Sequence, residues 1–392
     1  MTGLASAAVR AARRERLAGV DAARGLAVLG MVAVHVLPTT TAEGGLTLAE
    51  QIAGGRSSAA FAVLAGVGVA LATRRGTDRW RQRLRLLLRA LLVAALGLWL
   101  GELDTGVAVI LVYYGVFFVL LLPFLGWPPR RLLAAAAGVA LVVPVLSYAV
   151  RSRTSDPDYS NPTYDSLVRA PGELASELLL TGVYPAVPWA AYLLTGLAVG
   201  RLALDRTRTA ARLAAAGAAL WAAAAAVSAL LLGPAGGYAA LTDVAGSDDP
   251  AFVEEFVDFP YFGNVPTESW WLLAVDARHS STTPDLVGTT GTALLALGLC
   301  LLLTNGGLQL RRAGLLLAPL SAVGSMPLTA YTAHLLVLHH TDSDDPTQYY
   351  LLQVGTALVV APLWRRVVGR GPLEVVLAAA GRIVRPARSP AT

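Results

Sequence analysis

The chain of 392 residues contains no lysine, and all of its 31 basic residues are arginines. Its single cysteine, Cys300, lies inside an apolar run, so the sequence holds neither a disulfide framework nor a zinc-type cysteine motif. The adjacent His339 and His340, with Asp342 close behind, match no standard ligand spacing. We therefore expect no metal site and no redox chemistry.

Charged residues are also scarce, at 15%, whereas 55% of the residues are hydrophobic. The apolar runs repeatedly reach the length of about 20 residues that crosses the hydrocarbon of a bilayer. This pattern predicts an all-α polytopic integral membrane protein with about ten transmembrane helices. We place the spans at about 19–38, 55–73, 84–101, 106–126, 131–150, 183–201, 209–232, 285–304, 316–340 and 349–368.

The arginines are distributed unevenly between the loops that join these spans. With a cytoplasmic N-terminus, the outer side receives only Arg56, Arg151, Arg153, Arg169 and Arg278. Cytoplasmic loops carry the excess of basic residues in membrane proteins, so both termini are predicted to be cytoplasmic. Most acidic residues then lie outside, and the protein is expected in the plasma (cytoplasmic) membrane.

Four segments follow from this topology. Residues 1–18 form a cytoplasmic N-terminal segment, and not a signal peptide, because Asp21 and Arg24 interrupt the entry to the first apolar run. Residues 19–369 form the transmembrane domain. Within it, the aromatic and acidic segment 233–284 is expected to fold as an outer cap, and residues 370–392 form a cytoplasmic amphipathic segment. No internal repeat is evident, which argues against transporter folds built from duplicated halves.

The first span carries charged and titratable residues at both ends. Asp21 and Arg24 are three residues apart and share a helix face, and His35 follows about 16 Å further along the axis. Charged groups inside a bilayer are costly unless they face the protein interior or a watery cavity. This helix is therefore the first candidate for the wall of a site, although Asp21 and Arg24 could equally lock the helix entry by neutralising each other.

All five histidines map to the outer half of the predicted topology. Histidine exchanges protons near neutrality, so a histidine that faces a cavity can act as a general base or nucleophile. We take His35, His279 and His334 as candidate catalytic residues. The alternative for each is a structural histidine bonded to the backbone.

Two further spans offer candidate substrate-binding residues. Arg56 and Ser57 lie at the outer end of the second span, level with His35, although Arg56 could instead snorkel or pair with an outer glutamate. Tyr184 and Trp189 flank two prolines that are expected to delay or bend the sixth span, and could contact substrate or belong to an interfacial aromatic belt. Gly66 and Gly68, in the second span, suggest close helix packing.

The ninth span is unusually polar. Tyr331 and His334 are three residues apart on one face, and His35 is a possible partner at similar depth. On the cytoplasmic side, the dense arginine run 74–85 fits positive-inside sorting and anionic lipid, or the phosphates of a cytosolic donor.

Four stretches resemble a known family. They are D-A-A-R-G-L-A-V-L-G-M-V-A-V-H at 21–35, G-R-S-S-A-A-F-A-V-L-A-G at 55–66, Y-P-A-V-P-W-A-A-Y-L-L-T-G-L-A-V-G-R at 184–201 and G-P-L-E at 371–374. They look like the transmembrane acyltransferases related to the catalytic domain of heparan-alpha-glucosaminide N-acetyltransferase.

The resemblance implies transfer of an acyl group from a cytosolic acyl-CoA, typically acetyl-CoA, to a hydroxyl or amine acceptor on the opposite side of the membrane. A histidine would be the key catalytic group, and His35 occupies the matching place. Arg24, held by Asp21, would lie along the donor path, while Arg56 and Tyr331 would position the acceptor or stabilise the oxyanion. The acceptor would be a sugar or glycoconjugate.

A second reading remains open. A transporter or lipid-handling protein could use the same cavity without acyl chemistry. The expected partners are the lipid bilayer and a small-molecule or glycan acceptor, with no nucleic acid, and a homodimer is compatible with the sequence.

Overall fold

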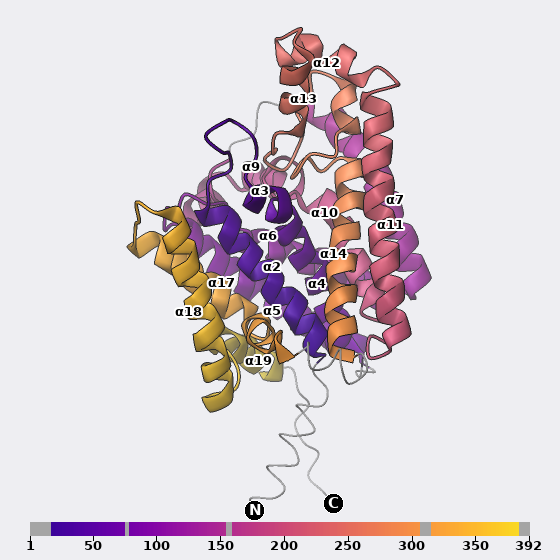
Figure 1. Cartoon of the computed structure of the whole chain (residues 1–392). Helices are drawn as coiled ribbons and strands as arrows, with labels where there is room; N and C mark the ends of the chain where they lie inside the picture. Colours follow the sequence, from indigo (N-terminus) through magenta and orange to yellow (C-terminus); the bar gives the residue numbers. More distant parts are fainter. Residues whose placement is uncertain (1–16, 75–77, 154–158, 306–314, 384–392) are drawn as a thin grey trace, which may run out of the picture.

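The computed structural model describes residues 17–74, 78–153, 159–305 and 315–383. The described residues are organised as helices, with only an isolated bridge between Thr40 and Leu46 in place of a sheet (Figure 1). The all-helical prediction is thus confirmed. The predicted segment 1–18 lies outside the described residues apart from its last two positions.

The helix α2 (Ala18–Val36) runs through the middle of the molecule (Figure 1). It packs against α4 (Arg56–Thr73), α14 (Thr283–Asn305), α16 (Ala318–Gly324) and α18 (Pro346–Val367). About two thirds of its apolar stretch is buried, which is the largest share among the candidate spans. A helix surrounded in this way can keep polar groups away from lipid.

A second group of helices is joined to α4 through α10 (Ala186–Val199). It consists of α5 (Arg79–Gly101), α6 (Leu111–Leu121) with the short turn η1 (Leu122–Gly126), α7 (Pro129–Arg151) and α10 itself. The helix α10 contacts α4, α6 and α7, while α5 packs against α6. Gly66 of α4 and Gly196 of α10 let the two backbones approach so closely that a Cβ on either would overlap the other helix. The predicted packing role is confirmed for Gly66. Gly68 instead faces the guanidinium of Arg24, so its lack of a side chain leaves room for that group.

The sixth predicted span starts late, as its two prolines suggest. Here α9 (Pro171–Ser176) continues into the π-type turn η2 (Glu177–Thr181), and the chain bends by 53° before α10 begins at Ala186. The short helix α3 (Leu48–Ala53) lies at the same end of the bundle (Figure 1), and α8 (Tyr164–Arg169) packs against α9. This end corresponds to the predicted outer side.

The segment 233–284 folds over the ends of two long helices. It contains α12 (Gly237–Ala245), α13 (Pro250–Asp258) and the turn η3 (Trp270–Ala274), and lies at one tip of the molecule (Figure 1). Its own small core joins Leu241, Val253 and Leu272 to Tyr148 of α7 and to Leu232 of α11 (Thr207–Leu232). The cap is therefore a packed unit.

Among the described residues, six helices are long and apolar enough to cross a membrane, or eight if each of two bent pairs counts as one span. The second bent pair joins α18 to α19 (Pro372–Ile383) at 45°. Of the ten predicted spans, 106–126 contains a shorter apolar helix, and 316–340 is divided into α16 and α17 (Pro327–His340) where a proline follows Met326. The number of ten and the cytoplasmic termini stay predictions.

Candidate active site

The inner pair of the first span forms as its spacing indicates. Arg24 donates to Asp21 Oδ1 at 3.2 Å, one helical turn away, and to the carbonyl of Leu64 on α4 at 3.4 Å. Asp21 is buried, and Arg24 is partly exposed. The carboxylate therefore offsets the charge of the guanidinium and also directs it toward α4.

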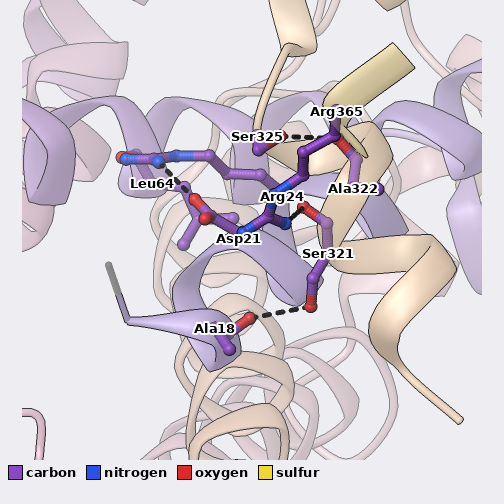
Figure 2. Close-up of polar contacts among 8 residues, drawn as sticks. All are labelled: Ala18, Asp21, Arg24, Leu64, Ser321, Ala322, Ser325 and Arg365. Atoms are coloured by element: carbon purple, nitrogen blue, oxygen red, sulfur yellow. Dashed lines mark hydrogen bonds and ion pairs between the residues drawn. The ribbon is translucent and has the colours of Figure 1, made fainter. Parts of the chain in front are cut away.

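The helix α16 fixes this end of α2. Ser321 donates its hydroxyl to the carbonyl of Ala18 at 3.0 Å, and Arg365 of α18 reaches the carbonyl of Ser321 at 3.3 Å. Figure 2 shows Asp21 and Arg24 beside these residues. Gly25 and Gly324 face the opposite backbone so closely that neither position has room for a Cβ. The crossing leaves the Asp21–Arg24 pair little freedom to move.

A cavity of about 370 Å³ opens beside this pair. Its polar lining includes Arg24, Arg89 of α5 and Glu374 of α19, and its deeper wall includes Tyr114 and Tyr331. The Arg89 guanidinium also lies 5.2 Å from the ring centre of Phe118. The cavity thus combines two cations with aromatic groups, and we call it the inner cavity.

Glu374, from the G-P-L-E stretch, ties α19 to the start of α17. One carboxylate oxygen accepts from the backbone N–H groups of Leu328 and Thr329, at 2.9 and 3.2 Å, and the other accepts from the Thr329 hydroxyl at 2.6 Å. The hydroxyl oxygen in turn accepts from the N–H of Leu373 at 3.2 Å. A carboxylate at a helix N-terminus satisfies orphan donors and interacts favourably with the helix dipole, so Glu374 is the N-terminal cap of α17.

The other end of α2 carries the second polar group of the site. Nδ1 of His35 lies 3.0 Å from Nε2 of His334 on α17, and the two rings stack. Nδ1 of His334 lies 2.7 Å from Oε1 of Gln353 on α18. Three helices thus contribute one side chain each to a single row of hydrogen bonds, and the predicted partnership of His35 with His334 is confirmed.

Tyr331 connects the inner cavity to this row. Its ring lies edge-on to His35, with 6.4 Å between the ring centres, and it also lines the inner cavity. The side chain is buried, and its hydroxyl has no side-chain hydrogen-bond partner in the described part of the chain. A ligand that enters the cavity past Arg24 would therefore meet Tyr331 next to His35.

His279 lies in a separate aromatic cluster. Its ring packs against Tyr184 and Trp189 at 5.3 and 5.8 Å, and Ser58 Oγ is 3.4 Å from Nε2. Its backbone has a φ of 59°, in the left-handed region. Burial lowers the pKa of His279 to about 4, so the ring is neutral at physiological pH. It lies within electrostatic range of His35 but is not part of the hydrogen-bonded row.

Tyr184 and Trp189 are buried, with exposed fractions of 6% and 2%, so the interpretation as an interfacial belt is wrong for both. In the core, Tyr184 lies edge-on to Tyr113, and Trp189 stacks with Phe117 and His279. Neither residue lines the inner cavity, and their contact with substrate stays a prediction.

Arg56 and Ser57 also point away from the histidine row. Arg56 donates to the carbonyl of Gln51 and lies 6.0 Å from the ring centre of Trp221 on α11. Its electrostatic neighbours include Glu50 and Arg278. Ser57 Oγ faces Gly30 of α2, where it fills the space that a Cβ would need. Direct contact of these two side chains with substrate remains a prediction.

Sequence reasoning missed three residues of this region. Gln353 could have been found as a lone carboxamide in an apolar span, since polar groups at that depth need a partner. Arg89 was hidden among the arginines around the start of the third span, and Glu374 stood out only as the last residue of the G-P-L-E stretch. Within the described residues, no group of three His, Cys, Asp or Glu side chains is arranged to hold a metal ion.

The comparison with known protein families matches the part of the chain that contains α2. The family profile described as heparan-alpha-glucosaminide N-acetyltransferase, catalytic, matches residues 16–231, more than half of the chain. The matched stretch contains His35, Asp21 and Arg24, whereas His334, Gln353 and Glu374 lie beyond it. No curated protein matches the chain. The chain belongs to the family of the heparan-alpha-glucosaminide N-acetyltransferase catalytic domain, a family of membrane acetyltransferases.

Proposed function

We propose that the protein transfers an acetyl group from cytosolic acetyl-CoA to a hydroxyl or amine acceptor on the outer side of the membrane. The observation that carries this proposal is the placement of Tyr331, which lines the inner cavity and lies edge-on to His35. Acetyl-CoA bound by Arg24 and Arg89 can therefore bring its thioester close to His35, which would act as the base at the opposite end of α2.

The sidedness of the reaction rests on the arginine distribution. The end of α2 that carries Arg24 is adjacent to the loops that hold most of the arginines, and this end is assigned to the cytoplasm. The end that carries His35 is then assigned to the outer side, together with the cap. We assign the whole molecule to the plasma membrane as a multi-pass protein.

The inner cavity suits the phosphates and pantetheine arm of coenzyme A. Arg24 and Arg89 present guanidinium groups, which form strong charge-assisted hydrogen bonds with phosphate oxygens. Beyond them, Phe61, Val93 and Leu111 provide an apolar wall for the arm that leads to the thioester. The acetyl carbonyl would reach Tyr331.

In the reaction, the acceptor oxygen or nitrogen attacks the thioester carbon while His35 takes the proton from the acceptor. The carbon–sulfur bond then breaks, the acetyl group remains on the acceptor, and the proton held by His35 passes to the thiolate of coenzyme A. The Tyr331 hydroxyl donates to the oxygen of the tetrahedral intermediate, whose charge would otherwise be unpaired in an apolar setting.

We place the acceptor beneath the cap. A cavity of about 480 Å³ there is lined by Tyr159, Phe259, Tyr261, Phe262 and Glu268. Its wall is joined to the His279 loop, because Tyr261 and Gly263 donate their backbone N–H groups to the carbonyls of Arg278 and His279 at 2.9 and 2.8 Å. Aromatic surfaces with a few polar groups are typical of small-molecule sites, and a sugar acceptor suits this lining.

The direct test is to incubate the purified protein in nanodiscs with acetyl-CoA labelled in its acetyl group. We expect release of free coenzyme A thiol, accompanied by label on an added amino sugar or in free acetate. The carrier alternative predicts a different result, in which label or sugar crosses the membrane of proteoliposomes without any thiol release. That result would exclude the acetyltransferase assignment.

Substitution of Arg89 by alanine tests the donor site. The loss of one charge-assisted phosphate contact should raise KM for acetyl-CoA by about tenfold or more, while kcat changes little because the acetyl group lies far from the guanidinium. Steady-state thiol release as a function of acetyl-CoA concentration measures both constants.

The matched control is Arg83→Ala, which removes an exposed arginine from the same helix outside the described lining of the cavity. Its KM should equal that of the wild type. An equal rise of KM in both variants would mean that α5 acts through its overall charge, and the assignment of Arg89 would be wrong.

A further inference from the structure

The row formed by His35, His334 and Gln353 has a defined beginning and end. Gln353 Oε1 ends the row on α18, and its Nε2 has no hydrogen-bond partner among the described residues. His334 lies in the middle and is 5% exposed. His35 begins the row on α2, with Nδ1 turned to His334 and Nε2 on the other side of its ring.

The chemistry of these groups assigns the protons. A carboxamide oxygen can only accept, so Nδ1 of His334 carries a hydrogen and donates it to Gln353. A neutral imidazole has a single N–H, so Nε2 of His334 holds a lone pair. The hydrogen between the two rings then belongs to Nδ1 of His35, and Nε2 of His35 is left with its lone pair exposed for reaction.

The environment explains why an amide ends this row. Gln353 sits on α18, where the apolar side chains of Leu351, Leu352, Val359 and Val360 are exposed. Gln353 and His334 also line a mostly apolar groove of about 450 Å³ between α2, α17 and α18. A carboxylate at this depth would be costly, whereas a neutral amide can orient the ring without introducing charge.

We propose that Gln353 is a positioning residue that fixes the tautomer of His334 and thereby keeps Nε2 of His35 free to act as the base. The proposal rests on the proposed function for its kinetic part, but the protonation pattern is a property of the resting protein. In other enzymes, too, a third residue holds a catalytic imidazole in one tautomer, and the activity falls when that tautomer is lost. Gln353 and His334 lie outside the stretch that matches the family, so the family assignment does not contain this inference.

The kinetic test compares two substitutions of Gln353. Gln353→Leu keeps the approximate size of the side chain but removes the acceptor, and kcat should fall about 10- to 100-fold, as for other groups that orient a reacting ligand from behind. KM for acetyl-CoA should not change, because the arginines of the inner cavity are untouched. Gln353→Glu restores an acceptor oxygen but introduces the costly carboxylate, so it should recover only part of the lost kcat.

The control is Gln348→Leu, the same change at an exposed position at the start of the same helix. It should leave kcat and KM at wild-type values. Equal activity of Gln353→Leu and Gln348→Leu would overturn the positioning role, as would a rise of KM in Gln353→Leu with kcat unchanged.

A spectroscopic test needs no turnover. The chain has five histidines, so the spectrum of ¹⁵N-histidine-labelled protein in nanodiscs is simple, and the His334→Gln variant identifies the signals of His334. We expect the wild-type ring of His334 to be neutral with its proton on Nδ1, and Gln353→Leu to shift the proton population toward Nε2.

The kinetic and spectroscopic tests together distinguish a failure of the Gln353 inference from a failure of the proposed function. A wild-type His334 with its proton on Nε2 would overturn the inference whatever the activity. A protein with the expected tautomer that never consumes acetyl-CoA would disprove the proposed function and leave the assignment of the protons standing.

Discussion

Replacement of His35 by alanine is expected to lower kcat for acetyl transfer by about 10²- to 10⁴-fold, the range that a positioned general base contributes. The variant should remain folded, because His35 lies at the last turn of α2 and its ring contacts His334 and Tyr331 at the edge of the helix core. Thiol release from acetyl-CoA measures the loss, and size-exclusion chromatography with the unfolding midpoint measures the fold.

The matched control is His339→Ala, which removes an exposed histidine at the end of α17. Its turnover should be that of the wild type. If His35→Ala retained full turnover while folded, the mechanism would have no role for the His35 end of α2 beyond its packing, and the base would have to be sought elsewhere.

Substitution of Gly324 by alanine is expected to have the largest effect on folding. The added Cβ would enter the backbone of α2 at the carbonyl of Asp21 and the N–H of Gly25, and neither helix backbone can move aside as a flexible side chain could. Over-packing of a well-packed core costs about 1–3 kcal/mol, and this contact belongs at or above the upper end of that range. We expect a lower unfolding midpoint and loss of monodisperse protein.

Gly138→Ala provides the comparison, since a Cβ at this position of α7 meets no atom within 4 Å. There the change should be neutral or slightly stabilising, because alanine has the higher helix propensity. Equal unfolding midpoints for the two variants would show that α2 and α16 are not in the tight contact described above.

Several residues of the site could be predicted from the sequence because their side chains are unusual in a lipid-facing helix. Asp21, Arg24 and His35 stood out because charged and titratable groups in a span need a protein partner. His334 was linked to His35 by depth alone. The division of the ninth span at Met326 had its signal in the following proline, and it was missed because the apolar run continues across it.

Other features could not be predicted from the amino-acid sequence alone. Tyr184 and Trp189 have the composition of an interfacial belt, and only the packing of α10 against its neighbours shows that they face inward. Arg56 shares a depth with His35, yet its rotation on α4 directs it to Trp221. The depth of a residue in the membrane can be counted along a helix. The direction of its side chain relative to the site depends on which helices are its neighbours.

The hydrogen bonds of Glu374 to the start of α17 connect the C-terminal helix α19 to the helix that carries Tyr331 and His334. Glu374 is an electrostatic neighbour of Arg89 and bonds the first turn of the helix that carries Tyr331 and His334. If a donor phosphate draws Arg89 away from Glu374, the anchorage of α17 changes with it. Thermodynamic linkage then requires reciprocity: whatever coenzyme A does to the affinity for the acceptor, the acceptor must do to the affinity for coenzyme A by the same factor. The two substrates would sense each other across the bilayer through one carboxylate.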